Sequence, residues 1–297
     1  MLLKTILWDA PVHALDKFLE IKGFFLAQAI AFKALITVIP VILFTLGLLG
    51  EYFQNAENLE LVAGLVRELI PVYLDDFMVF FEHFQSEGGN VTLIGAIGTF
   101  ILATVLMNTL CIVVSEVFAG KHHHERSFLS QYGFSFQLVL QVGGIFALTV
   151  LISIAIQTIN LAGLSFIQEL GIDKVWVQSG WRRLINFLGI IVPFLLTAAM
   201  FFQLYYLIPK PHPPLRSVLL GTATAAIFWE AAKALFTLYA TNFAFFNRFR
   251  NDIVFGIEDL SNTIGLIIAF MVWVYYSGIV FIMGSIVVML DEKRRLA

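Results

Sequence analysis

Six long apolar runs, separated by shorter polar segments, dominate the hydropathy pattern of this 297-residue chain. They cover residues 24–49, 91–118, 134–158, 184–208, 215–243 and 262–290. A helix rises about 1.5 Å per residue, so each run can cross a hydrocarbon core about 30 Å thick. Helices are expected because lipid offers no hydrogen-bond partners for the backbone. The pattern predicts an all-α polytopic membrane protein, with six transmembrane helices in a single integral membrane domain over 1–297.

Composition supports this class and excludes others. Hydrophobic residues make up 59% of the chain and charged residues only 13%, which is not the balance of a soluble domain. The net charge of −3 gives no indication of nucleic-acid binding. The single cysteine, Cys111, lies in an apolar run, so no intrachain disulfide can form.

The distribution of lysine and arginine predicts the orientation. With the N-terminus inside, ten of these residues fall on the inner side and six on the outer side. The positive-inside rule therefore predicts a multi-pass protein with both termini in the cytoplasm.

The segment 51–90, between the first two apolar runs, has a different composition. It holds eight acidic residues and one basic residue. Within it, Phe77, Phe80, Phe81 and Phe84 share one face of a helix at i, i+3, i+4 and i+7. We expect an amphipathic helical segment in the first outer loop, which lies in the membrane interface or covers the bundle.

Charged residues interrupt two of the predicted spans. The stretch "AAIFWEAAKALF" places Glu230 and Lys233 three residues apart, on neighbouring turns of one helix face. Lys33 interrupts the first span in the same way. An isolated charge at the bilayer centre costs about 2.5–3.5 kcal/mol on insertion scales, so these side chains should pair or face a polar cavity. Their depths, about 14 Å for Lys33 and about 18 Å for Glu230, would allow these two residues to meet.

Amide side chains add further polar groups within the predicted spans. Asn108, Gln141, Gln157 and Gln203 all lie in apolar runs and could line the same cavity. One interpretation is a substrate, ion or proton site formed by Lys33, Glu230, Lys233 and these amides. The alternative is a structural network of buried pairs that fixes how the helices pack.

Two shorter motifs have simpler interpretations. "KHHHER" at 121–126 is expected to form a surface turn rather than a metal site, because three adjacent histidines cannot all face one ion from a helix. Arg182 and Arg183, at the start of the fourth span, could bind lipid headgroups, or could only reach towards the interface.

Proline and glycine predict where helices end and where they approach closely. "IPKPHPP" at 208–214 should end the fourth helix in a rigid turn. Pro40 lies within the first span and is expected to kink it. Gly95 and Gly98 provide a small-residue face suited to close helix contact.

Signatures of soluble-type active sites are absent from the sequence. It contains no Walker A motif, no H-E-x-x-H and no G-x-S-x-G, so no catalytic residue, metal or cofactor is predicted.

Several of these motifs resemble the YihY/BrkB family of bacterial inner-membrane proteins. The similarity lies in "AQAIAFKALITVIPVILFTLGLLG", in "FFQLYYLIPKPHPPLRSVLLGTATAAIFWEAAKALFTLYATNFAFF" with its Trp-Glu-x-x-Lys, and in "FMVWVYYSGIVFIMGSIVV". The chain departs from the family pattern where Ser285 follows Gly284 in place of an acid, and where Phe255–Gly256 stands for a Tyr-Gly. The resemblance implies six inner-membrane helices. Family proposals tend towards transport or envelope lipid handling.

Three functional hypotheses follow. The first is a small transporter or lipid-translocation protein with a polar cavity and an anionic substrate, because two lysines outnumber one glutamate. The second is a non-transporting scaffold that docks an envelope partner through 51–90. The third is a membrane-bound ribonuclease, a former label of the family, which the chain supports poorly because it lacks a cytoplasmic metal cluster and a basic track for phosphates. Membrane lipids are the expected partners, and nucleic acid is not.

Overall fold

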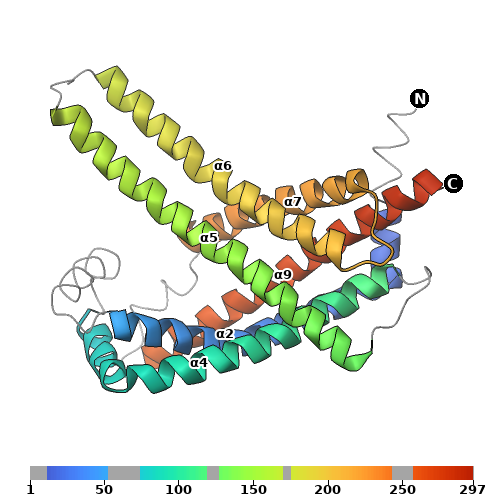
Figure 1. Ribbon diagram of the computed structural model, residues 1–297, viewed down its shortest axis with the longest axis horizontal. Coiled ribbons are helices and arrows are strands. Elements are labelled where there is room, and N and C mark those ends of the chain that lie inside the picture. The colour runs from blue at the N-terminus through green and yellow to red at the C-terminus, as the bar shows by residue number, and fades with distance from the viewer. Residues whose placement is uncertain (1–11, 53–73, 119–126, 170–174, 243–256, 297) are drawn as a thin grey trace.

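Long helices form most of the described structure, as the sequence predicted. The computed structural model describes residues 12–52, 74–118, 127–169, 175–242 and 257–296 (Figure 1). Its long helices are α2 (Gly23–Tyr52), α4 (Leu74–Val117), α5 (Phe128–Glu169), α6 (Val175–Leu207), α7 (Leu215–Asn242) and α9 (Ile257–Leu296). No strand occurs within these ranges. Each predicted apolar run lies within one helix to within one residue, which confirms the all-α membrane fold.

Five of the helices contain a segment that is long and apolar enough to cross a membrane. These segments are Gly23–Thr45, Gly89–Val117, Leu129–Thr149, Arg183–Leu207 and Phe270–Arg295. The helix that corresponds to the predicted fifth run, α7, has 28 residues but is not among them within the described part of the chain. Arg216, Glu230 and Lys233 lower its apolar character. The six-span count therefore stays a prediction.

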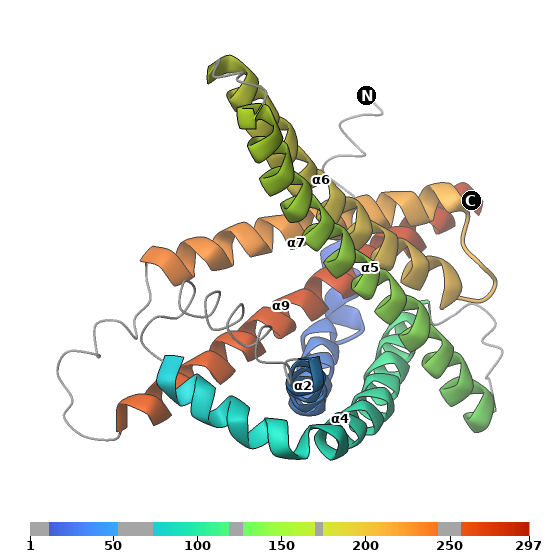
Figure 2. The same ribbon diagram turned by 60° about the vertical axis from the view of Figure 1, so that its left-hand side comes forward.

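Helix α9 is the centre of the arrangement. It packs against α2 and α4, which come early in the chain, and against α6 and α7, which come later. Helix α5 contacts α4 and α6. The helices meet at the end of the bundle where α2, α5, α7 begin and α4, α6 end, and this end is called the convergent end below (Figures 1 and 2). The α5–α6 pair extends away from α2 and α4 towards the opposite end.

The buried core lies in the half of the bundle next to the convergent end. It is formed by the first part of α2 with Ala27 and Ile30, the last part of α4 from Met107 to Val117, and the last part of α9 from Val280 to Met289. Tyr205 of α6 and Val218 of α7 complete it. Large side chains in the described remainder of α5 and α6, such as Phe146 and Leu184, are exposed.

Helices α2 and α4 approach each other closely where small residues meet. A Cβ atom at Gly98 would lie 2.9 Å from Cβ of Pro40, and one at Gly95 would collide with the backbone of Phe44. The predicted small-residue contact is thus confirmed, and α2 continues as a helix through Pro40.

Helices α7 and α9 are equally close. A Cβ atom at Gly221 would lie 2.6 Å from the carbonyl oxygen of Gly284. A larger residue at position 221 would therefore push the backbones of α7 and α9 apart. The proline-rich turn behaves as predicted, because α6 ends at Leu207 and α7 begins at Leu215.

The amphipathic segment expected in the first outer loop is helical where the structure describes it. Residues 74–90 are the beginning of α4 and continue without a break into its apolar part, along a curved course (Figure 2). The reason is that no proline interrupts the helix between the two parts. The remainder of the 51–90 segment, residues 53–73, lies outside the described residues.

A short helix over residues 12–20 precedes α2 at the convergent end. Its Ala14 and Phe18 are buried in the core, whereas Leu15 and Leu19 are exposed. Lys17 and Glu20 form an ion pair of 2.8 Å on this helix.

Candidate functional site

The two charged residues of α7 form an ion pair with each other. Nζ of Lys233 lies 2.5 Å from Oε1 of Glu230, one turn away on the same helix. An i, i+3 pair of this kind needs no partner from another helix, because both side chains leave the same face. The predicted pairing of Glu230 with Lys233 is therefore present in the structure.

Aromatic packing next to the pair fixes the rotation of α7. The ring of Trp229 lies edge-on to Phe201 of α6, with centroids 5.9 Å apart, and to Trp273 of α9, with centroids 5.2 Å apart. Because Trp229 points at both neighbouring helices, Glu230 lies about 100° further round the helix. The aromatic contacts thus determine where the ion pair faces.

The pair lies at the edge of the buried face of α7. Ala225, Ala226 and Ala232 mark this face and are buried, while Ile227 on the opposite side is 61% exposed. The side chains of Glu230 and Lys233 are 35% and 40% exposed, so they are neither sealed in the core nor fully outside it. The paired oxygen, Oε1 of Glu230, is itself buried, so the exposed surface belongs to the rest of the two side chains.

Lys33 lies on a different part of the bundle from this pair. Its helix, α2, packs against α4 and α9, whereas α7 packs against α6 and α9. The carboxylate of Glu230 is paired with Lys233 and not with Lys33. No ion pair of Lys33 occurs within the described residues, where its side chain is half-buried.

The amide side chains form two separate cross-helix hydrogen bonds. Nε2 of Gln203 on α6 donates to Oε1 of Gln141 on α5 over 2.5 Å, and Nε2 of Gln131 on α5 donates to Oδ1 of Asn108 on α4 over 3.1 Å. All four side chains are half-buried. Gln141 and Gln203 thus join α5 to α6, while Asn108 is joined to α5 by Gln131, which the sequence analysis did not single out. The side chain of Gln157 lies outside the described ones.

Taken together, the predicted polar residues occupy distinct positions along the described helices: the charge pair on α7, the amide pairs on α5, and Lys33 on α2. Sequence spacing places these residues on their helices, but it does not contain the information on which helices become neighbours. That all of them line one cavity stays a prediction.

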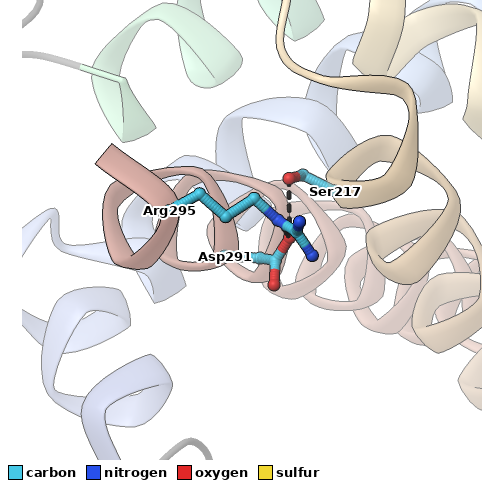
Figure 3. A network of polar contacts seen from close by, with 3 residues as sticks. All are labelled: Ser217, Asp291 and Arg295. Carbon is cyan, nitrogen blue, oxygen red and sulfur yellow. Dashed lines mark hydrogen bonds and ion pairs between the residues drawn. The ribbon is translucent and has the colours of Figure 1, made fainter. Parts of the chain in front are cut away.

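A polar network that sequence reasoning missed joins α7 to α9 near the convergent end (Figure 3). Oγ of Ser217 donates to Oδ2 of Asp291 over 2.6 Å, and Nε of Arg295 donates to the same oxygen over 2.8 Å. The spacing of Asp291 and Arg295, one turn apart at i, i+4, was a signal that could have indicated the ion pair. Nothing in the sequence indicated that Ser217 would lie beside it.

A second missed contact is made by Tyr205, which is 1% exposed. Its hydroxyl donates to the backbone carbonyl of Phe281 over 2.8 Å, and the two rings stack with centroids 5.4 Å apart. This contact joins α6 to α9 within the core.

The remaining candidates are only partly described. Arg183 is exposed at the start of the apolar part of α6, and the side chain of Arg182 lies outside the described ones. Residues 121–126, with the three histidines, also lie outside the described ranges. Within those ranges no group of three or more His, Cys, Asp or Glu side chains could hold a metal ion.

The arrangement suits binding better than bond-breaking chemistry. The Glu230–Lys233 pair offers one carboxylate and one ammonium at a partly exposed position in an apolar helix, next to an indole ring. Such a pair can exchange its internal contact for contacts with a polar group of a ligand.

Comparison with known proteins gives consistent matches over most of the chain. The family described as Virulence factor BrkB matches residues 14–297. A UPF0761 membrane protein of Cronobacter sakazakii is 22% identical over 275 residues, which cover 91% of this chain and 84% of that protein. The UPF0761 membrane protein YihY of Salmonella typhimurium is 25% identical over 241 residues, which cover 80% of this chain and 73% of that protein. No solved structure matches the chain.

Proposed function

The chain belongs to the Virulence factor BrkB family of membrane proteins, and from this premise we propose that it is a small transporter or lipid-translocation protein of the bacterial inner membrane. Its polar site is the Glu230–Lys233 pair, and its termini lie in the cytoplasm, as the distribution of lysine and arginine favours.

The observation that supports this proposal most strongly is the partial exposure of an ion pair within an apolar helix. Two charges that served only to fix helix packing would be best placed in the core, where other protein groups complete their hydrogen bonds. Glu230 and Lys233 instead lie at the edge of the buried face, with 35% and 40% of their side chains exposed. A ligand can therefore reach the pair without unpacking α7 from α6 and α9.

The position of the pair favours an amphiphilic substrate. The neighbouring exposed face of α7 carries Ile227 and Phe228, which are 61% and 51% exposed. A molecule with a polar headgroup and an apolar tail could place the headgroup at the charges and the tail along this face. An anionic headgroup can exchange with the carboxylate of Glu230 for the ammonium of Lys233.

The packing of the bundle is consistent with access from one end. The core lies next to the convergent end, where α6, α7 and α9 are tied by the contacts of Tyr205 and Ser217. The α5–α6 pair extends away from α2 and α4 at the other end (Figure 1). A translocation path would then be closed at the convergent end in this state.

The experiment uses purified protein in liposomes that contain fluorescently labelled phosphatidylglycerol, with a membrane-impermeant quencher added outside. Wild-type protein should expose the inner-leaflet label to the quencher. Glu230→Gln and Lys233→Met should each reduce that rate at least tenfold, because each removes one of the two charges that form the site. The matched control is Glu20→Gln, which breaks the other i, i+3 pair, Lys17–Glu20, outside the apolar segments.

Two results would refute the proposal. If Glu230→Gln and Lys233→Met accumulate normally and translocate label at the wild-type rate, the pair is not the polar site. If both variants fail to accumulate in membranes while the double variant Glu230→Gln/Lys233→Met accumulates without activity loss, the pair has a structural role only.

A further inference from the structure

The carboxylate of Asp291 joins the start of α7 to the end of α9. Oγ of Ser217 and Nε of Arg295 both donate to its Oδ2 atom (Figure 3). Arg216 is the residue next to Ser217, so two arginines occur where α7 begins and α9 ends.

Positive charge remains in excess at this position. Arg295 uses Nε for Asp291, and its two terminal nitrogens are further donors. Arg216 and Arg295 are exposed, while Asp291 is half-buried. Guanidinium groups bind phosphate oxygens through paired N–H donors, so two exposed arginines at this end of the bundle offer donors to a phosphate group.

An apolar stripe begins directly beside Arg216. Leu219, Leu220, Ala223 and Ile227 follow it at i+3, i+4, i+7 and i+11, which places them on the same side of α7. The three large members of this stripe are 57%, 47% and 61% exposed. The stripe runs away from the convergent end for about 16 Å, the length of eleven helical residues.

We propose that Arg216 and Arg295 bind the phosphate of an anionic phospholipid in the leaflet that surrounds the convergent end, with its acyl chains along the Leu219–Leu220–Ile227 stripe. Asp291 is a positioning residue that holds Arg295, and its hydrogen bond from Ser217 fixes the start of α7, which carries Arg216. A cation directly above an exposed apolar stripe is complementary to an anionic lipid, since a free phosphate would make no use of the stripe. This site does not depend on the proposed translocation, because it lies at the end of α7 and needs no movement of lipid.

The test measures lipid binding by the purified full-length protein in detergent micelles. Retention of phosphatidylglycerol and of zwitterionic phosphatidylcholine is compared by native mass spectrometry, and the unfolding midpoint is recorded in each lipid. Wild-type protein should retain phosphatidylglycerol preferentially and unfold at higher temperature in its presence. Arg216→Gln should weaken this binding about tenfold, the change expected when one charge-assisted contact is lost.

Lys293→Gln is the matched control. It removes one exposed positive charge from the same last turn of α9. Lys293 is two positions from Asp291 and two from Arg295 in the sequence, so it lies on the other side of α9. It should leave the preference for phosphatidylglycerol unchanged. Arg295→Gln should reproduce the effect of Arg216→Gln, and Arg216→Lys should restore part of it.

Three outcomes would overturn the proposal. Equal losses in Arg216→Gln and Lys293→Gln would mean that only diffuse surface charge attracts the lipid. Equal retention of the two lipids by wild-type protein would mean that there is no headgroup site. Equal stabilisation by inorganic phosphate and by phosphatidylglycerol would assign the arginines to a free anion instead of a lipid.

Discussion

The hydroxyl of Tyr205 on α6 donates a hydrogen bond to the backbone carbonyl of Phe281 on α9, with 2.8 Å between the two oxygen atoms. The same hydroxyl lies against Gly284, where a Cβ atom would collide with it and would lie 2.9 Å from Cβ of Ala225 on α7. A glycine under a buried tyrosine thus allows three helices to meet at one point of the core. The contact is testable because its two halves can be changed separately.

Tyr205→Phe and Gly284→Ala should be coupled. The first change removes a hydrogen bond and should cost about 1 kcal/mol of unfolding free energy. The second inserts a methyl group into a packed site and should cost about 1–3 kcal/mol. The double variant should be less destabilised than the sum of the two, because removal of the hydroxyl opens space for the new methyl group. Unfolding in detergent, followed by tryptophan fluorescence, measures all three. Strictly additive costs would contradict the proposed contact.

The close approach of α2 and α4 predicts that two glycines differ in how well they tolerate a large side chain. Gly95→Leu should separate the helices and strongly lower the yield of folded protein, since even a Cβ atom would collide with the backbone of Phe44. Gly143→Leu on α5 is the control, because nothing lies within 4 Å of a Cβ atom at that position. Size-exclusion profiles after extraction show whether each variant folds. Similar behaviour of the two variants would exclude a close α2–α4 contact.

The sequence was sufficient to predict the helices, because each apolar run is longer than a bilayer core and its ends are marked by charged residues or prolines. It was also sufficient for Gly95 and Gly98, whose lack of side chains has only one use on a lipid-embedded helix face. The helix at the start of α4 was predicted from the spacing of its phenylalanines. Its continuity with the apolar run was not predicted, although nothing in the chain stops the helix between Leu74 and Gly89.

The sequence predicted those contacts of the polar site that form within one helix, but not those between helices. Glu230 and Lys233 pair because their spacing on α7 places them together, whichever helices surround them. The meeting of Lys33 with Glu230 required α2 and α7 to be neighbours, which helical periodicity cannot specify. The Ser217–Asp291 bond, between residues 74 positions apart, depends in the same way on the packing of α7 against α9.

Asp291→Asn should destabilise the protein more than Ser217→Ala does. The asparagine keeps a hydrogen-bond acceptor but removes the negative charge that balances the guanidinium of Arg295. We expect a lower unfolding midpoint for Asp291→Asn at low ionic strength and partial recovery in high salt, because salt screens exposed charges. The neutral change Ser217→Ala should show no such salt dependence. Equal salt dependence in the two variants would show that the carboxylate charge does not hold Arg295.

Whether α7 crosses the membrane can be tested by finding on which side of the membrane Lys210 and Arg294 lie. Both residues are exposed, and between them the chain contains α7 and the apolar segment of α9. If both helices cross, the two residues lie on the same side; if α7 does not cross, they lie on opposite sides.

In a Cys111→Ala background, which removes the single native cysteine, Lys210→Cys and Arg294→Cys should both resist a membrane-impermeant thiol reagent added to whole cells and react only after permeabilisation. Gly180→Cys, before the apolar part of α6, should react from outside. Labelling of only one of the first two positions would mean that α7, together with its charge pair, does not span the bilayer, because α9 alone reverses the side of the chain once.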